Sequence, residues 1–171
     1  MSNYFTQSPE QLKEFLEFIE DDIDNVRRVI DTVEEKGLDA DFMVHAKSET
    51  VEESAENTDI DEKEIVKTLV FMADEPVAVL CPGHTSVSET KLESILEAEI
   101  RMASPEEVTE ATGYYVGGVS PFDLDIPVLM EESILEQEKV KPAAGSRVVG
   151  VTINTEDLKE VTGAEVVDVS R

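Results

Sequence analysis

The first part of the chain carries apolar residues at helical spacing. They recur every three or four positions from Leu12 to Val33, which predicts an amphipathic helix that ends near Gly37. Residues 8–11, Ser-Pro-Glu-Gln, are typical of a helix start, with an N-cap serine, a proline in the first turn and a capping glutamine. The spacing fits one long helix or two abutting helices with a break near residues 21–22.

Short apolar runs and short helical segments alternate along the rest of the chain. The runs at 64–73 and 76–81 are separated by polar turn residues, which is a hairpin signal. Thr50 and Ser86, each followed three residues later by Glu, are expected N-caps. We expect strands at 41–46, 64–73, 76–81, 126–130, 146–153 and 165–169, and helices at 50–57, 86–96, 104–113 and 155–163. Because no regular βαβ repeat is present, this order predicts an α+β domain with a mixed sheet.

The chain is strongly acidic. It holds 40 Asp and Glu residues against 14 Lys and Arg, a formal net charge of -26 at pH 7. The regular apolar pattern argues against disorder. Two interpretations remain: a partner with a basic surface, or adaptation to concentrated salt, where a Debye length of about 3 Å screens self-repulsion. We favour salt adaptation, because the acids are spread along the whole chain and form no acidic tail.

The length and the cysteine content indicate the class of protein. A chain of 171 residues suits a single domain with a substantial core. The single cysteine, Cys81, excludes an intramolecular disulfide and fits a reducing compartment. The first residues lack the segments of a signal peptide, and no apolar run approaches the roughly 18 residues that span a bilayer. We therefore expect a cytoplasmic protein with no membrane contact.

Residues 81–84, Cys-Pro-Gly-His, raise the question of a metal site or a Cys-His catalytic pair. Structural zinc needs four protein ligands and catalytic zinc three, whereas His45 is the only other histidine. A cysteine at the end of an apolar strand is usually part of the core, and the Pro-Gly after it is turn chemistry. We predict no metal site and no cofactor.

Lys67 interrupts an otherwise apolar run. Strand alternation places it on one face with Leu69 and Phe71, and the residues between them on the other face. A lysine on such a face either extends to water or meets an anionic or carbonyl partner in a cleft. The pattern alone favours extension to water.

Three of the chain's eight glycines lie within residues 112–122. The Gly117-Gly118 pair fits a tight turn, or it lets backbone N–H groups face a ligand oxygen, as in oxyanion-stabilising loops. In the second case Ser120 would add a hydroxyl and Pro121 would hold the shape of the loop. The pattern alone favours the turn.

In four segments, which occur in the family's order, the chain resembles the YbaK/ProX family of aminoacyl-tRNA editing domains. The segments are VKTLVF, RMASPEEVTEATGYYVGGVSPF, IPVLMEES and AAGSRVVGVTINTEDLKEVTGAEVVDV. The resemblance runs from about Val26 to the C-terminus. It implies an N-terminal helical extension over residues 1–25 and an editing domain over residues 26–171. The implied α+β fold has helices around a mixed, barrel-like sheet.

The resemblance also implies an activity, which is hydrolysis of the ester between a wrong amino acid and the 3′-terminal adenosine of a tRNA. The family includes free-standing deacylases of Ala-tRNA(Pro) and Cys-tRNA(Pro), so the implied partners are the aminoacyl-tRNA 3′ end and prolyl-tRNA synthetase. By position it implies catalytic roles for Lys67, Gly118 and Ser120, and substrate-binding roles for His45, Gly117, Pro121, Glu131 and Gly145. Glu131 stands where members often carry Asp or Asn, which leaves its reach to the substrate open.

The implied chemistry suits these residues. An aminoacyl ester is already activated, so a polarised carbonyl and a placed water suffice, and Lys67 and the Gly118 region can supply hydrogen-bond donors. Editing provides a second selection by size, because one pocket separates small side chains by only about 1–3 kcal/mol. The alternative is a non-catalytic binding module with the same fold that associates with a synthetase or another protein. Glu131 and the acidic surface favour this alternative, whereas Lys67 and the intact loop at residues 117–121 speak against it, and we prefer the deacylase.

Overall fold

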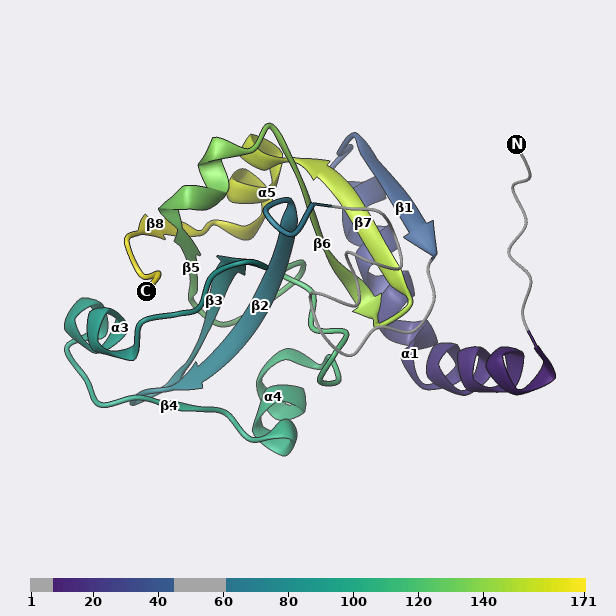
Figure 1. Cartoon of the computed structure of the whole chain (residues 1–171), viewed down its shortest axis with the longest axis horizontal. Helices are drawn as coiled ribbons and strands as arrows, with labels where there is room; N and C mark the ends of the chain where they lie inside the picture. Colours follow the sequence, from purple (N-terminus) through teal and green to yellow (C-terminus); the bar gives the residue numbers. More distant parts are fainter. Residues whose placement is uncertain (1–7, 45–60) are drawn as a thin grey trace.

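The structure is a computed structural model that describes residues 8–44 and 61–171 (Figure 1). His45 and the helix expected at 50–57 lie outside the described residues. A curved sheet runs through the centre of the molecule, and the long helix α1 lies across one of its ends (Figure 1). In the described ranges, no helix combines the length and the apolar character needed to cross a membrane.

Helix α1 runs without interruption over Pro9–Glu35, so the alternative of two helices with a break near residues 21–22 is wrong. Its start has the expected capping box, in which the Ser8 and Gln11 side chains each accept from the other's backbone N–H. The helix continues through the acidic pair because apolar side chains on either side of it pack on the same core.

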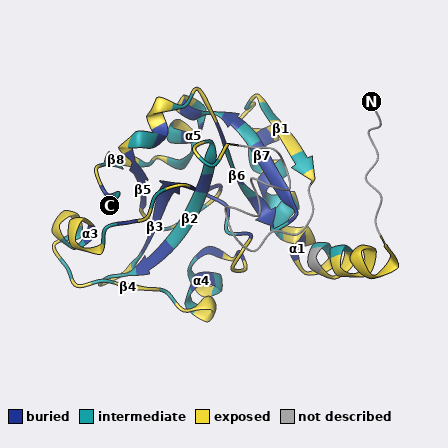
Figure 2. Cartoon of the chain, viewed as in Figure 1, coloured by how far each residue is buried: buried dark blue, intermediate teal, exposed yellow. Residues whose placement is uncertain are grey.

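The two halves of α1 have different surroundings. The C-terminal half packs against β6, and Val29 and Val33 are buried there. The N-terminal half projects beyond the sheet (Figures 1 and 2), where Leu12 and Leu16 are about half exposed, at 49% and 53%. The boundary expected between residues 25 and 26 therefore falls inside one continuous helix.

Eight strands form one mixed sheet in the described part of the chain. They are β1 Ala40–Val44, β2 Ile65–Met72, β3 Pro76–Pro82, β4 Arg101–Met102, β5 Val128–Glu131, β6 Lys139–Ser146, β7 Val149–Asn154 and β8 Glu165–Val167. Their order is β1-β7-β6-β2-β3-β5-β8, with β4 paired to β2. The β2–β6, β3–β5 and β5–β8 pairs are parallel and the others antiparallel. The α+β class with a mixed sheet is confirmed, but the sheet is curved rather than closed, because β1 and β8 end the order without pairing to each other.

Four short helices accompany α1 in the residues that the structure describes. They are α3 Glu89–Leu96, α4 Pro105–Thr112, the 3-10 helix η1 Glu132–Glu136 and α5 Thr155–Thr162. Ser104 and Glu107 form the expected capping box at the start of α4. The expected start of α3 is wrong, since its N-cap is Ser88. Ser86 lies before the helix because its carbonyl oxygen accepts from the Arg171 N–H at 2.9 Å.

The segment expected as a single strand at 146–153 contains the turn of a hairpin followed by its second strand. Strand β6 ends at Ser146 and β7 begins at Val149, so the expected strand is wrong in its first residues. The pattern does not predict β6, because Pro142 and Gly145 interrupt its apolar positions. Gly145 has a φ of +91° and lies at a shift of register, which is typical of a glycine bulge.

The sheet separates two apolar clusters. The first cluster lies on the side of α1 and includes Val66, Tyr114 and Phe122. The second lies on the side of α3 and includes Leu92 and Cys81. Cys81 is fully buried, as its position at the end of an apolar strand predicts, and burial raises the pKa of its thiol.

Candidate functional site

Lys67 lies in a row of side chains that crosses three strands. It pairs with Cys81 in the β2–β3 register. In the β3–β5 register Leu80 pairs with Met130, so the next residues along these strands, Cys81 and Glu131, lie side by side. Because paired residues share a face of a sheet, Lys67, Cys81 and Glu131 all lie on the side of the second cluster.

A backbone carbonyl holds the ammonium group of Lys67. Its Nζ donates to the carbonyl oxygen of Thr85, just beyond β3, and Thr85 Oγ1 lies 3.0 Å from Cys81 Sγ. The lysine is half-buried and shares its face with Leu69 and Phe71, as strand alternation predicts. Of the two alternatives for Lys67, the structure shows a carbonyl partner rather than extension to water.

Glu131 is buried and has hydrogen bonds at both carboxylate oxygens. As the N-cap of η1 it accepts from the Ser133 N–H at 2.8 Å and from the Ser133 hydroxyl, and it also accepts from the Val169 N–H at 3.3 Å. Burial acts to raise the pKa of this carboxyl, but the hydrogen bonds outweigh burial and hold the pKa below its ordinary value of 4.5. Its contacts in the structure are therefore with η1 and the C-terminal segment.

The glycine loop, defined as residues 113–123, contains a tight turn. Gly117 has a φ of +96°, and the Gly118 N–H donates to the carbonyl oxygen of Tyr115 at 3.0 Å. The Gly118 N–H is therefore hydrogen-bonded within the loop, as the turn interpretation expects.

Glycines also bring three backbone segments into close contact. A Cβ atom at Gly118 would lie 2.8 Å from both the Cα and the N of Ser146, in the β6–β7 hairpin. A Cβ atom at Gly145 would lie 2.7 Å from the carbonyl carbon of Asn25, in α1. The glycine loop therefore rests on the hairpin, and the hairpin rests on α1.

Two buried hydroxyl groups lack a hydrogen-bond partner among the described residues: Ser120 Oγ, in the glycine loop, and Thr68 Oγ1. Most buried polar side chains are paired, so such hydroxyls are candidates for contact with a ligand or a water. Thr68 alternates with Lys67 and shares the face of Val66, whose cluster includes Phe122 from the glycine loop. Sequence reasoning did not select Thr68, although its position next to Lys67 was an available signal.

The edge of β2 at residues 67–69 has no strand partner on one side in the described part of the chain. On this side β2 pairs with β6 only at Ile65 and Val66, and with β4 only at Phe71 and Met72. Lys67 and Thr68 flank this open edge from opposite faces of the sheet.

The expected site residues thus fall into two groups. The first consists of Gly117, Gly118, Ser120 and Pro121 in the glycine loop and Gly145 in the β6–β7 hairpin, which Gly118 contacts. The second consists of Lys67 and Glu131, on the other face of the sheet. Between residues that the structure describes, no hydrogen bond or ion pair joins Lys67 to the glycine loop.

Comparison with known proteins agrees with the resemblance in the sequence. Residues 45–161 match the profile of the family described as "Aminoacyl-tRNA editing domain". The uncharacterized protein YwhH of Bacillus subtilis is 33% identical over 123 residues, which cover 70% of this chain and 78% of that protein. The proline–tRNA ligase of Solidesulfovibrio magneticus is 39% identical over 88 residues, which cover 50% of this chain and 15% of the ligase. The crystal structure of a candidate trans-editing enzyme for prolyl-tRNA synthetase matches with a TM-score of 0.78 and 29% identity, over 86% of this chain and 97% of that one.

Proposed function

The chain belongs to the family of aminoacyl-tRNA editing domains, and we propose that it is a trans-acting deacylase of mischarged tRNA, of the Ala- or Cys-tRNA(Pro) type. Similarity to a candidate trans-editing enzyme over nearly all of that chain supports action in trans. The observation that carries the proposal is the fully buried hydroxyl of Ser120, which lies near the Tyr114 hydroxyl but has no hydrogen-bond partner among the described residues, and which we assign to contact with the substrate.

The proposed reaction divides the roles among these residues. Ester hydrolysis is accelerated by donors that are fixed in place before negative charge develops on the carbonyl oxygen. We assign this role to Lys67, and we assign orientation of the ester and the attacking water to the hydroxyls of Ser120 and Thr68. Because Lys67 and Thr68 flank the open edge of β2 from opposite faces, we place the substrate along this edge. Gly118 contributes by close packing on Ser146, since its N–H is donated within the loop.

Recognition of the tRNA has to tolerate the strong negative charge of this chain. With 14 basic residues against 40 acidic ones, few phosphate contacts are available, and concentrated salt would weaken those that form. We propose that recognition rests on the terminal adenosine and the aminoacyl group, with prolyl-tRNA synthetase as a partner that supplies the remaining tRNA contacts. A role in translation would place the protein in the cytoplasm.

The first prediction is the activity itself. We expect the protein to hydrolyse Ala-tRNA(Pro) or Cys-tRNA(Pro) well above the uncatalysed rate and to spare Pro-tRNA(Pro), because the larger proline side chain is excluded by size. The measurement is release of labelled amino acid from each charged tRNA, at tens of millimolar and at molar KCl. Absence of turnover for both mischarged tRNAs at every salt concentration would refute the proposal and support the non-catalytic binding module.

The second prediction concerns salt adaptation, which we propose as the origin of the acidic composition. Self-repulsion within a chain of net charge -26 is screened as the Debye length shortens from about 30 Å at 0.01 M to about 3 Å at 1 M salt. The melting temperature is therefore expected to rise as KCl increases over this range. A flat or falling melting temperature would indicate a basic partner protein instead.

A further inference from the structure

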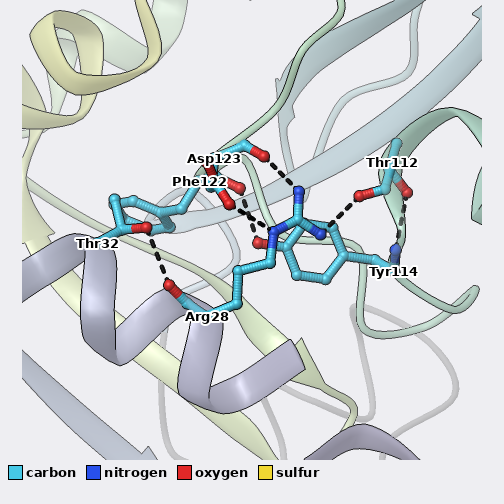
Figure 3. Close-up of polar contacts among 6 residues, drawn as sticks. All are labelled: Arg28, Thr32, Thr112, Tyr114, Phe122 and Asp123. Carbon is cyan, nitrogen blue, oxygen red and sulfur yellow. Dashed lines mark hydrogen bonds and ion pairs between the residues drawn. The ribbon is translucent and has the colours of Figure 1, made fainter. Parts of the chain in front are cut away.

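One arginine of α1 joins the two ends of the glycine loop (Figure 3). Arg28 Nη1 donates to the carbonyl oxygen of Thr112, immediately before the loop, at 2.7 Å. At the other end of the loop, Arg28 Nε donates to Asp123 Oδ2 at 2.8 Å, and Nη2 donates to the Asp123 carbonyl oxygen. A single planar guanidinium group therefore fixes the separation of the two ends.

The same guanidinium group packs on an aromatic ring inside the loop. Arg28 Cζ lies 4.2 Å from the ring centroid of Tyr114, which is fully buried. The Tyr114 hydroxyl donates to the Phe122 carbonyl oxygen at 2.7 Å, which is a second bridge across the loop (Figure 3). Burial raises the pKa of Tyr114 to about 12, although the charge of Arg28 acts in the opposite direction, so the hydroxyl remains a donor at neutral pH.

The backbone at both ends of the loop is adapted to this arginine. Gly113 has a φ of +80°, and a Cβ atom at this position would lie 2.8 Å from Arg28 Nη1. Asp123 has a φ of +57°, a left-handed conformation that Asp adopts more readily than most residues. Each end of the loop therefore has a residue in the left-handed backbone conformation and makes a direct contact with the guanidinium group.

From these contacts we propose that Arg28 is a positioning residue of the editing site, an inference that rests on the proposed function. Arg28 touches the ends of the loop and not the open edge of β2, so it acts through the loop. Ser120 lies between the two ends that Arg28 holds, and release of one end lets the segment that carries Ser120 move. Because displacement of a catalytic group by about 1 Å costs up to about 10²-fold in rate, such release lowers turnover more than substrate binding.

The test compares Arg28→Ala and Arg28→Lys with Arg27→Ala. Arg27 is the neighbouring residue of the same helix and is exposed, so its variant controls for the loss of a positive charge from α1. For Arg28→Ala we expect kcat to fall about tenfold or more with KM changed less than about twofold, at a temperature where all variants are folded. Arg28→Lys keeps the charge but lacks the planar fork, so we expect it to restore kcat only in part.

Hydrogen exchange reports the loop independently of activity. The amides of Tyr114 and Gly118 are hydrogen-bonded to Thr112 Oγ1 and to the Tyr115 carbonyl oxygen, and both should exchange at least about tenfold faster in the Arg28 variants than in Arg27→Ala. If Arg28→Ala does not fold, the same kinetic and hydrogen-exchange measurements are made on Arg28→Lys and Asp123→Asn.

The inference is overturned if the folded Arg28 variants match Arg27→Ala in both kcat and amide exchange. Faster exchange with unchanged kcat would also overturn it, because Arg28 would then order the loop without serving the reaction. A parent protein that hydrolyses neither ester would refute the proposed function and, with it, the catalytic half of this inference. The exchange rates would then decide separately whether Arg28 orders the loop.

Discussion

We expect Lys67→Ala to lower kcat/KM for deacylation about 10²–10³-fold, the effect of removing one donor to a developing oxyanion. In the structure the Lys67 ammonium donates to the Thr85 carbonyl oxygen, a neutral group, so this partner does not neutralise its charge. That charge remains available to stabilise negative charge on the ester. Folding should change little, because a half-buried lysine contributes mainly its aliphatic stem to packing. Single-turnover hydrolysis of charged tRNA, at equal folded fraction, measures the effect.

Two further variants make this prediction specific. Lys67→Arg keeps the positive charge but brings a larger planar group, so a role within a small site predicts a substantial loss of activity. Lys63→Ala removes an exposed lysine just before β2 and should leave the rate unchanged. If Lys67→Ala and Lys67→Arg both fold and deacylate at the rate of the parent, the assignment of Lys67 to the site is wrong.

Local signals were sufficient to predict most helices and strands of this protein. The capping boxes at Ser8 and Ser104 and the apolar runs of β2 and β3 depend on neighbouring residues, and all appear in the structure. Strand β6 was not predicted because its proline and bulged glycine break the alternation, and because its pairing with β2 involves residues that are distant in the chain. The predicted start of α3 was wrong for a similar reason, because the carbonyl oxygen of Ser86 accepts a hydrogen bond from the N–H of Arg171, which is distant in the chain.

The candidate site was predictable in its residue types but not in its geometry. Alternation along β2 correctly placed Lys67 with Leu69 and Phe71, but it did not show that the edge between β4 and β6 is left open at this point. The glycine pair indicated a special backbone. Its hydrogen bond within the loop and its contact with Ser146 depend on how the hairpin folds. The role of Arg28 could not be predicted, since its partners lie more than 80 residues away in the chain.

The largest effect on stability is expected at Glu131. We expect Glu131→Gln to lower the free energy of unfolding by about 3 kcal/mol, because hydrogen bonds to a charged group contribute about 1.5–3 kcal/mol each and the amide of Gln cannot accept at both positions. The Ser133 N–H and the Val169 N–H would then compete for a single acceptor. Urea denaturation at neutral pH measures the change, and Glu136→Gln, at an exposed position of η1, is the matched control.

The pH dependence of the same variant tests the cause of this stabilisation. The folded pKa of Glu131 lies below its ordinary value of 4.5, because hydrogen bonds to the carboxylate outweigh the opposing effect of burial. A carboxyl with a lowered pKa stabilises the fold fully above its unfolded pKa, and this contribution is lost as the pH falls through the folded value. The difference in unfolding free energy between the parent and Glu131→Gln should therefore be constant from pH 7 down to about pH 5 and shrink below about pH 4.5. A difference that stays constant down to pH 3 would show that the carboxylate charge does not contribute, and that packing alone accounts for the buried side chain.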